Sequence, residues 1–165
     1  MKTKSDKKRI LHHWREAVPN DRMAHLIRDA ARLLGRELKN SLIQHAIPFG
    51  HWTFLRILWQ RDGLTQKELS DLAGVMEPTT FVAIKAMELQ GYIKRQKSPN
   101  NRKNMYVFLT SRGKLLEKKL VPLAVEVNEL AFKGVSQEHL KITRQTLLRS
   151  IENLESNNDD LTQTN

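Results

Sequence analysis

Residues 64–95 read LTQKELSDLAGVMEPTTFVAIKAMELQGYIKR, and this stretch decides the fold. Thr65 and Glu68 have the spacing of a capping box, in which the threonine hydroxyl and the glutamate carboxylate each bond a free backbone N–H at the start of a helix. A helix is therefore expected over residues 66–73. Gly74 follows it at the position where a left-handed backbone commonly ends a helix.

A second helix is predicted directly after this turn. Pro78 suits its first turn, where a missing N–H costs nothing, and Gly91 supplies the residue after a helix that runs to about Gln90. The first residues of this helix mix hydroxyl and apolar side chains where a surface helix usually carries charge: Glu77, Pro78, Thr79, Thr80, Phe81 and Val82. Two helices joined by a short turn make a helix-turn-helix.

A β-hairpin is predicted after the second helix. Residues 92–97 and 105–109 are two short strand-like runs, and the segment SPNNRKN between them is rich in turn formers and positive charge. Helix, turn, helix and basic hairpin is the order of a winged helix-turn-helix domain, expected here over about residues 52–112. The predicted fold class is therefore mainly α with a small β-hairpin wing.

Helices with apolar stripes flank this domain on both sides. The stripe of the first repeats at helical spacing: Met23, Leu26, Ile27, Ala30, Leu33, Leu34, Leu38 and Leu42. Thr110 is expected to cap a helix after the hairpin, and Ser136 to cap the last one, which carries Leu140, Leu147, Ile151 and Leu154. Because one small winged domain cannot cover all these side chains, we expect dimerisation helices over about residues 10–48 and 111–155.

The chain is expected to form a single unit over residues 10–155, with a disordered segment at each end. Residues 1–9 hold five Lys or Arg against Asp6 alone, which is typical of a solvated basic arm, and the functional interpretation is an arm that contacts DNA. Residues 156–165 have no hydrophobic side chain except Leu161 and are expected to be a disordered tail.

Composition narrows the classes of function. The formal charge of +10 and the isoelectric point near 10.0 indicate a polyanionic partner such as nucleic acid or an acidic membrane surface. Cysteine is absent, which excludes disulfides and thiolate metal sites. No apolar run reaches the roughly 18 residues needed to span a bilayer, and no apolar signal segment follows the basic N-terminus, so a cytoplasmic location is expected.

The sequence contains no pattern for catalysis or for a metal site. Its six histidines, including the adjacent His12 and His13, show no spacing of paired ligands. There is no glycine-rich phosphate loop, nucleophile elbow or paired-carboxylate motif. We therefore expect a protein that is not an enzyme and has no cofactor.

Three segments carry a resemblance to a known family. GLTQKELSDLAGV, PTTFVAIKAMELQGYIKR and NNRKNMYVFLTSRG resemble the successive motifs of the MarR family of winged-helix transcription regulators, and the resemblance extends from about Trp14 to Leu154. The chain departs from the family at the hairpin tip, where Asn101, Arg102 and Lys103 stand in place of the usual Asp-x-Arg. The ion pair that props the wing in the family is therefore missing.

The resemblance implies a homodimer that binds a pseudo-palindromic operator as a repressor. It also implies release by a small molecule, often an aromatic acid, bound between the dimer helices and the winged domain. Charge supports the DNA partner independently, because residues 61–114 hold ten Lys or Arg against five Asp or Glu. The alternatives are a ligand-independent or architectural winged-helix protein and, in another class, a membrane-surface or protein-interaction module.

The second helix of the helix-turn-helix is the expected recognition helix. Its N-terminal end would enter the major groove, with the core face formed by Thr80, Ala83, Ile84 and Met87. The predicted DNA-binding residues are Thr65, Gln66, Thr79, Phe81, Val82, Lys85, Arg95, Asn101, Arg102 and Lys103.

An effector site is expected where the long helix meets the winged domain. An aromatic carboxylate needs a stacking ring and a cation or hydrogen-bond donor, which aromatic and basic side chains supply. The predicted ligand-binding residues are Arg15, Phe49, His51, Trp52 and Arg56. The alternative is that Trp52 belongs to the core and that His51 caps a helix.

Overall fold

The computed structural model describes the backbone of residues 23–98 and 101–162 and the side chains of residues 23–97 and 104–157. The predicted basic arm and Arg15 lie outside these ranges. Within the chain, contacts divide residues 1–127 from residues 128–165, giving two compact units.

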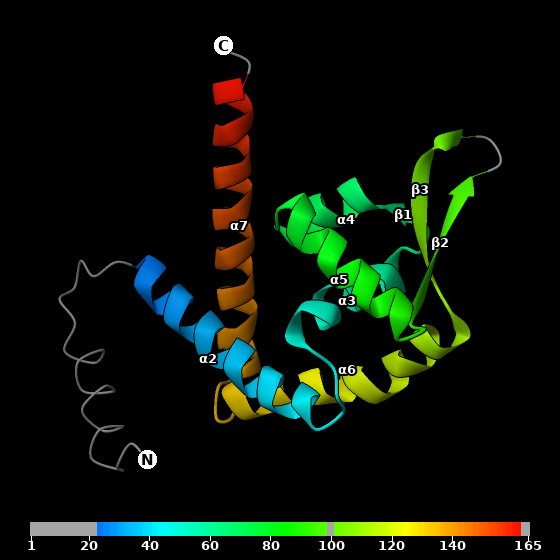
Figure 1. The fold of residues 1–165 in the computed structure, drawn as a ribbon. Coiled ribbons are helices and arrows are strands. Elements are labelled where there is room, and N and C mark those ends of the chain that lie inside the picture. Colours follow the sequence, from blue (N-terminus) through cyan, green and yellow to red (C-terminus); the bar gives the residue numbers. More distant parts are fainter. Residues whose placement is uncertain (1–22, 99–100, 163–165) are drawn as a thin grey trace. The chain divides into compact units, whose positions relative to one another are not determined.

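The described part is mainly helical with one small antiparallel sheet, which confirms the predicted fold class (Figure 1). In order along the chain, the elements are α2 (Met23–Ile43), α3 (Phe49–Gln60), β1 (Leu64–Thr65), α4 (Gln66–Ala73), α5 (Glu77–Leu89), β2 (Ile93–Ser98), β3 (Asn101–Leu109), α6 (Ser111–Ala131) and α7 (Gln137–Thr162).

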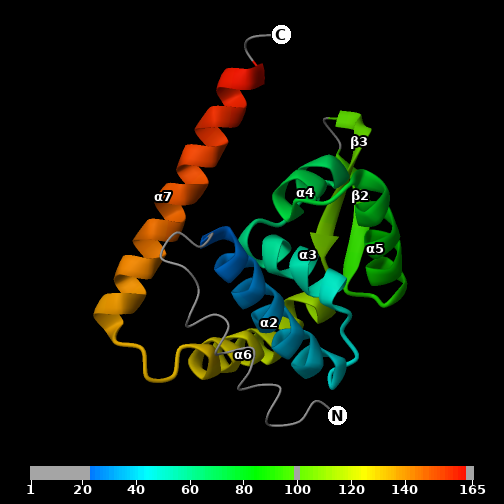
Figure 2. The same ribbon diagram turned by 90° about the vertical axis from the view of Figure 1, so that its left-hand side faces the viewer.

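The sheet has the strand order β1-β3-β2, and the far end of the β2–β3 hairpin extends beyond α4 and α5 (Figures 1 and 2). The hairpin differs from its prediction, because β2 continues to Ser98 and β3 begins at Asn101, so most of the expected loop is strand. The backbone ladder continues past a register shift between Lys97 and Ser98, the kind of irregularity that a β-bulge introduces. β1 was not predicted, because two residues are too few for an alternating pattern.

The helix-turn-helix forms as its sequence predicts. The Thr65 hydroxyl accepts a hydrogen bond from the Glu68 backbone N–H at 3.2 Å, and the Glu68 carboxylate accepts one from the Thr65 N–H at 2.8 Å. Helix α4 ends at Ala73 because Gly74 takes a left-handed conformation at φ 63°. These contacts confirm the capping box and fix where α4 begins and ends.

Helices α3, α4 and α5 pack on the sheet, and together these elements, residues 49–109, form the winged unit and enclose its core. Seven residues of this core have at most 1% of their surface exposed: Leu55, Leu58, Leu64, Leu69, Ile84, Met87 and Val107. Leu42 at the end of α2 and Leu120 of α6 join the same cluster. This packing sets the orientation of α5, the helix expected to contact DNA.

The start of α6 packs closely on the chain just after α5, and a glycine in α6 allows this close contact. A Cβ on Gly113 would lie 2.0 Å from the Tyr92 carbonyl oxygen, so no larger residue fits there without a backbone shift. The Thr110 hydroxyl accepts from the Gly113 N–H at 3.1 Å, which confirms the predicted cap. The Trp59 indole N–H donates to the Gly113 carbonyl at 3.0 Å and anchors α3 to the same point.

Helix α7 makes up most of the second unit. The predicted cap is present, since the His139 backbone N–H donates to the Ser136 hydroxyl at 3.2 Å. The helix continues to Thr162, so the prediction of a disordered tail from residue 156 is wrong over most of that segment. No proline or glycine interrupts the chain after Gly134, and the low hydrophobicity used for the prediction does not by itself end a helix.

Candidate nucleic-acid interface

Helix α5 has one buried and one exposed face, as the sequence predicts. Thr80, Ile84 and Met87 are at most 1% exposed, whereas Phe81 is 46% and Val82 is 67% exposed. The side chains of Thr79 and Lys85 are also exposed, and Ala83 is half-buried. The four predicted groove residues of α5 are therefore available to a partner.

A buried pair of hydroxyl groups joins the two helices of the motif. The Ser70 hydroxyl of α4 lies 2.8 Å from the Thr80 hydroxyl of α5 and 3.0 Å from the Gln66 carbonyl. Both hydroxyl side chains are buried, so each needs such a partner. This contact was not predicted. The sequence feature that could have indicated it is a polar residue at a core-facing position in each of the two helices.

Arg95 connects the wing to α5. Its guanidinium binds the Glu88 carboxylate, with Nη2 at 2.6 Å and Nε at 2.8 Å, and its backbone N–H donates to the same group at 3.2 Å. The hydrogen bonds from Arg95 lower the pKa of Glu88 below its usual value. The Arg95 guanidinium is thus already engaged within the protein, and its predicted DNA contact remains a prediction.

Thr65 and Gln66 lie at the start of α4, both half-buried. The Thr65 hydroxyl is used in the capping box, and the hydrogen bonds from Thr65 lower the pKa of Glu68. Arg61 lies beside that carboxylate at 3.3 Å. Capping is therefore the role that the geometry supplies for Thr65, and a phosphate contact through the helix start remains a prediction.

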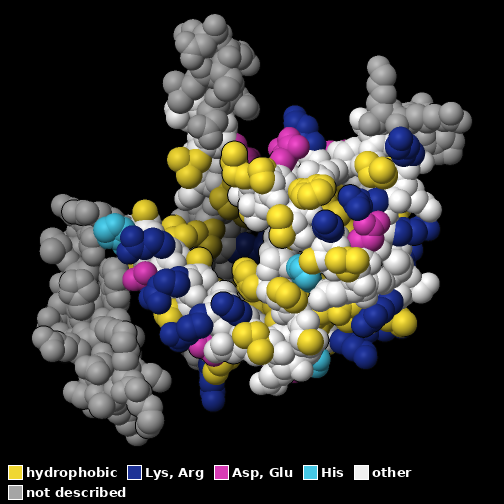
Figure 3. Space-filling model, viewed as in Figure 1, with side chains coloured by type: hydrophobic (Ala, Val, Ile, Leu, Met, Phe, Trp, Pro, Cys, Tyr) yellow, Lys and Arg dark blue, Asp and Glu magenta, His cyan; other side chains and the backbone are white. Residues whose placement is uncertain are grey.

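The wing presents positive charge along β2. Lys94 and Lys97 are exposed, and sequence reasoning did not select them although the run KRQK on an edge strand was visible. Asn101, Arg102 and Lys103 belong to β3, but their side chains lie outside the described residues. Over the region of α4 and α5, basic and hydrophobic side chains are interspersed on one face (Figure 3).

Two of the predicted ligand-binding residues are buried. His51 and Trp52 are each 7% exposed, and the Trp52 ring packs edge-on against Trp59 with centroids 5.7 Å apart. Trp52 is therefore a core residue, the alternative that the sequence left open. His51 is not a cap, because α3 begins after Pro48 without a side-chain hydrogen bond.

The His51 imidazole has an unusual environment. Its Nδ1 atom is buried without a hydrogen-bond partner, as is Oε1 of Gln90. Burial lowers the pKa of His51 below 6.5, and the nearby Gln90 side chain opposes this shift only in part. The ring is thus enclosed within the protein, where burial favours its neutral form, and it is not presented to a ligand.

Phe49 and Arg56 are the exposed members of the predicted ligand set. They are seven residues apart on α3, which places them on the same side of the helix about two turns apart. The Phe49 ring also lies close to α2, since a Cβ on Gly35 would be 3.9 Å from it. An aromatic ring and a cation therefore share one accessible helix surface.

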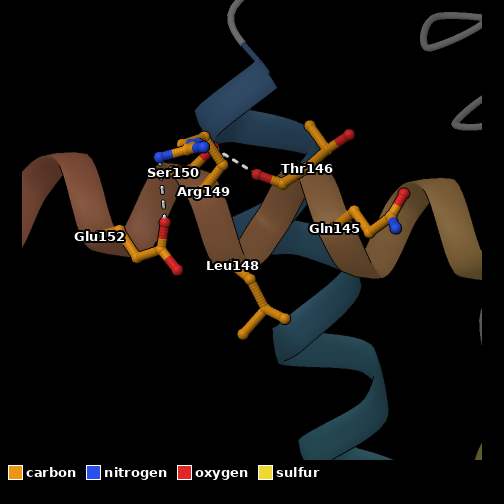
Figure 4. A pocket seen from close by; sticks show the side chains of 6 residues that line it. All are labelled: Gln145, Thr146, Leu148, Arg149, Ser150 and Glu152. Atoms are coloured by element: carbon orange, nitrogen blue, oxygen red, sulfur yellow. Dashed lines mark hydrogen bonds and ion pairs between the residues drawn. The ribbon is translucent and has the colours of Figure 1, made fainter.

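A depression along α7 is lined by Gln145, Thr146, Leu148, Arg149, Ser150 and Glu152. Arg149 forms an ion pair with Glu152 at 3.4 Å, and Leu148 extends from the opposite side of the helix to Thr146 (Figure 4). All six side chains come from one helix, and they do not converge on a common point.

Among the residues whose side chains are described, no group of three potential metal ligands occurs. In the same part of the chain, no helix is long and apolar enough to cross a membrane.

The fold defines a winged helix-turn-helix protein, and proteins of known structure share it. Residues 49–105 match the MarR family. The regulator TtmR of Methylorubrum extorquens is 26% identical over 91 residues, 55% of this chain and 47% of that protein, so the chain spans about half its length. The organic hydroperoxide resistance transcriptional regulator of Bacillus subtilis is 26% identical over 138 residues, 84% of this chain and 92% of that protein.

A solved structure agrees with these sequence matches. The MarR transcriptional regulator of Methanosarcina mazei superimposes with a TM-score of 0.72 at 28% identity, covering 81% of this chain and 96% of that one. Residues 49–105 thus carry the sequence signature of the MarR family, and the fold is that of its winged-helix transcriptional regulators. These relatives are transcriptional regulators and not enzymes, which agrees with the expected class of function.

Proposed function

We propose that the chain is a homodimeric repressor that binds a pseudo-palindromic DNA operator and is released by a small aromatic acid. The observation that carries the DNA-binding part is the exposed face of α5, where Thr79, Phe81, Val82 and Lys85 are presented while the opposite face is fixed in the core. The N-terminal part of such a helix is the part that reaches base edges in the major groove.

The excess of positive charge supports the same interface. Lys85, Lys94 and Lys97 are exposed on the recognition helix and the wing. Cations of this kind supply affinity for phosphates by releasing counterions, independently of sequence, and base contacts then discriminate. The buried Ser70–Thr80 contact and the Arg95–Glu88 ion pair hold these elements in one arrangement.

The homodimer is proposed because α7 has apolar side chains that its own unit does not cover. Five of them are between 38% and 67% exposed: Ile142, Leu147, Leu148, Ile151 and Leu154. Uncovered apolar surface of this extent on a helix favours association. Two-fold symmetry would then place the recognition helices on two half-sites about one DNA turn, ~10 bp, apart or a small multiple of that.

A binding experiment tests the DNA-binding proposal. The full chain should bind a duplex obtained by selection from a random library, with affinity that falls steeply with salt, and should not bind vesicles of anionic lipid. Lys85→Gln should weaken duplex binding, while Lys141→Gln, a change of an exposed lysine on α7, should not. Binding to the vesicles but to no duplex would contradict the proposal and support the membrane-surface alternative.

The effector is proposed to bind at the exposed surface of Phe49 and Arg56. A guanidinium can hold a carboxylate in a bidentate pair, and the phenyl ring offers a stacking surface. His51 and Trp52 are buried, so Phe49 and Arg56 are the members of the predicted set that a ligand can reach. For release, the acid must bind the DNA-incompetent form more tightly, and a coupling of about 1–3 kcal/mol lowers operator affinity roughly 5–150-fold.

A thermal-shift screen of small aromatic acids tests the effector proposal, because a ligand that binds the native state raises the melting temperature. The best acid should lower operator affinity of the wild type, and Arg56→Gln should reduce that response without changing operator affinity in its absence. If no acid changes operator affinity, the ligand-independent winged-helix alternative is favoured.

A further inference from the structure

The exposed face of α5 has few of the side chains that most often read purines. Arginine or lysine pairs with guanine, and asparagine or glutamine with adenine, through two hydrogen bonds in the major groove. Of these four residue types, the sequence of α5, EPTTFVAIKAMEL, contains only lysine, at the exposed Lys85 alone. Its polar side chains on the exposed face are Glu77, Thr79 and Lys85, while Glu88 is occupied by Arg95.

Apolar side chains occupy most other exposed positions at the start of α5. Met76 immediately before α5 is 76% exposed, Val82 is 67% exposed and Phe81 is 46% exposed, and Pro78 is exposed between them. The major-groove edge of a base pair offers one feature suited to apolar contact, the methyl group at C5 of thymine. The same chemical group is present on 5-methylcytosine.

The rotation of α5 that exposes these side chains is fixed by its buried face. Thr80 bonds Ser70 in the core, and Ile84 and Met87 are almost completely buried. A rotation that hid Phe81 or Val82 would break the Ser70 contact and expose Ile84. The apolar face is therefore a stable feature of the winged unit.

We propose that α5 recognises the 5-methyl groups of pyrimidines in the major groove, with Phe81 and Val82 as the contacting residues. This inference rests on the proposed DNA-binding function and adds the feature of the bases that is read. Covering one methyl group is worth about fourfold in affinity, from the usual transfer free energy of a buried CH₂ group. Phe81 and Val82 thus contribute to sequence preference, whereas Lys85 contributes to general affinity.

The test compares duplexes that differ only in methyl groups. A duplex selected from a random library by the full chain is resynthesised with deoxyuridine in place of each thymidine in turn, and affinities are measured by fluorescence anisotropy. At the contacted positions, loss of the methyl group should weaken wild-type binding about fourfold. At each of those positions, the thymine–adenine pair is also replaced by a cytosine–guanine pair and by a 5-methylcytosine–guanine pair, and the two affinities are compared. This comparison distinguishes recognition of thymine as a base from recognition of the methyl group alone.

The protein side of the test uses Phe81→Ala and Val82→Ala, with Lys85→Ala as the matched control on the same exposed face. At least one of the first two variants should lose the difference between thymine and uracil, while Lys85→Ala should weaken both duplexes equally and keep the difference. Thermal unfolding confirms that these surface variants are folded, and the wild-type comparison stands without them.

Each outcome has a defined meaning. Equal wild-type affinity for the thymine and uracil duplexes would overturn the inference but leave the DNA-binding function intact. A difference that persists in both Phe81→Ala and Val82→Ala would also overturn it, since the methyl group would then be read elsewhere. Failure to enrich any duplex in the selection would instead contradict the proposed function and, with it, this inference.

Discussion

Apolar side chains at helical spacing are buried in the winged unit but exposed on helix α7. In the winged unit, Leu69 and Ile84 are at most 1% exposed, because three helices and a sheet enclose them. In α7, Ile151 is 51% and Leu154 is 67% exposed. The stripe of α7 has the same helical spacing as a core-facing stripe, so the difference lies in what covers it.

Periodicity in the sequence identifies an apolar face of a helix but not the surface that covers it. The winged unit supplies its own cover and should owe its stability to internal packing. Helix α7 has no such cover within its own unit, and its stripe should contribute through association. The two kinds of apolar residue should therefore respond differently to truncation and to protein concentration.

The largest effect should come from truncating the core of the winged unit. Leu69→Ala should lower the free energy of unfolding by about 2–5 kcal/mol, from lost burial and the cavity left behind. Urea unfolding at several protein concentrations measures it. Leu154→Ala is the matched change on α7, and its effect should be smaller and should depend on concentration. Equal, concentration-independent losses would remove the distinction between the two regions.

The next largest effect should come from placing a charge in the α7 stripe. Ile151→Glu should raise the dimer dissociation constant more than tenfold, because losing one buried aliphatic side chain costs about 1.5–3 kcal/mol. Sedimentation equilibrium measures the dissociation constant. The control is Lys141→Glu, a charge change on an exposed lysine of α7. A wild type that is monomeric at micromolar concentration would contradict the proposed dimer directly.

Gly113→Ala tests the close contact between the start of α6 and the winged unit. We expect a loss of about 1–3 kcal/mol or more in the free energy of unfolding, because the new Cβ meets the backbone oxygen of Tyr92. Gly50→Ala is the matched control in α3, where a Cβ meets nothing within 4 Å. That change should stabilise the helix by about 0.5–1 kcal/mol. Similar losses in both variants would argue against the close approach to Tyr92 as the cause of the effect at Gly113.

A smaller effect is expected for the capping box. Thr65→Ala should destabilise the chain by about 1 kcal/mol, because the N–H of Glu68 loses its acceptor. Thr79→Ala, a change of an exposed threonine in α5, should alter the free energy of unfolding by less than about 0.5 kcal/mol. Thermal unfolding of both variants gives the comparison, and an effect of Thr79→Ala as large as that of Thr65→Ala would argue against a special role for the cap.

The smallest expected effect is confined to a pH window. Burial lowers the pKa of His51 in the folded state below 6.5, so the unfolded state takes up its proton first as the pH falls. The contribution of this group is therefore complete above about pH 6.5 and is lost as the pH falls through the folded-state pKa. Wild type should lose more stability than His51→Leu in this range, as measured by urea unfolding. Parallel pH profiles would contradict the prediction.

Local signals made some elements predictable. The capping box and Gly74 gave the bounds of α4, and helical spacing gave the buried and exposed faces of α5. Both depend on residues within a few positions of one another. The hydroxyl contact between Ser70 and Thr80 was missed because it joins two helices, and no local rule pairs those positions.

The predicted effector residues show what proximity along the chain leaves undecided. Phe49, His51, Trp52 and Arg56 were grouped because they are close in sequence, yet α3 divides them between its buried and exposed sides. The Trp52 ring is used in the core against Trp59, and His51 is enclosed beside Gln90. Proximity along the chain could not reveal which side of α3 faces the core.

The helix-turn-helix, the caps, the basic charge and the two faces of α5 could be predicted from the sequence, because they follow from composition, short-range hydrogen bonding and periodicity. The arrangement of the elements in space was needed to show that β1 joins the sheet, that Arg95 is paired with Glu88, and that His51 is buried. The physical reason is that burial and pairing depend on which elements meet in space. A local pattern specifies the faces of an element but not the surface that will cover each of them.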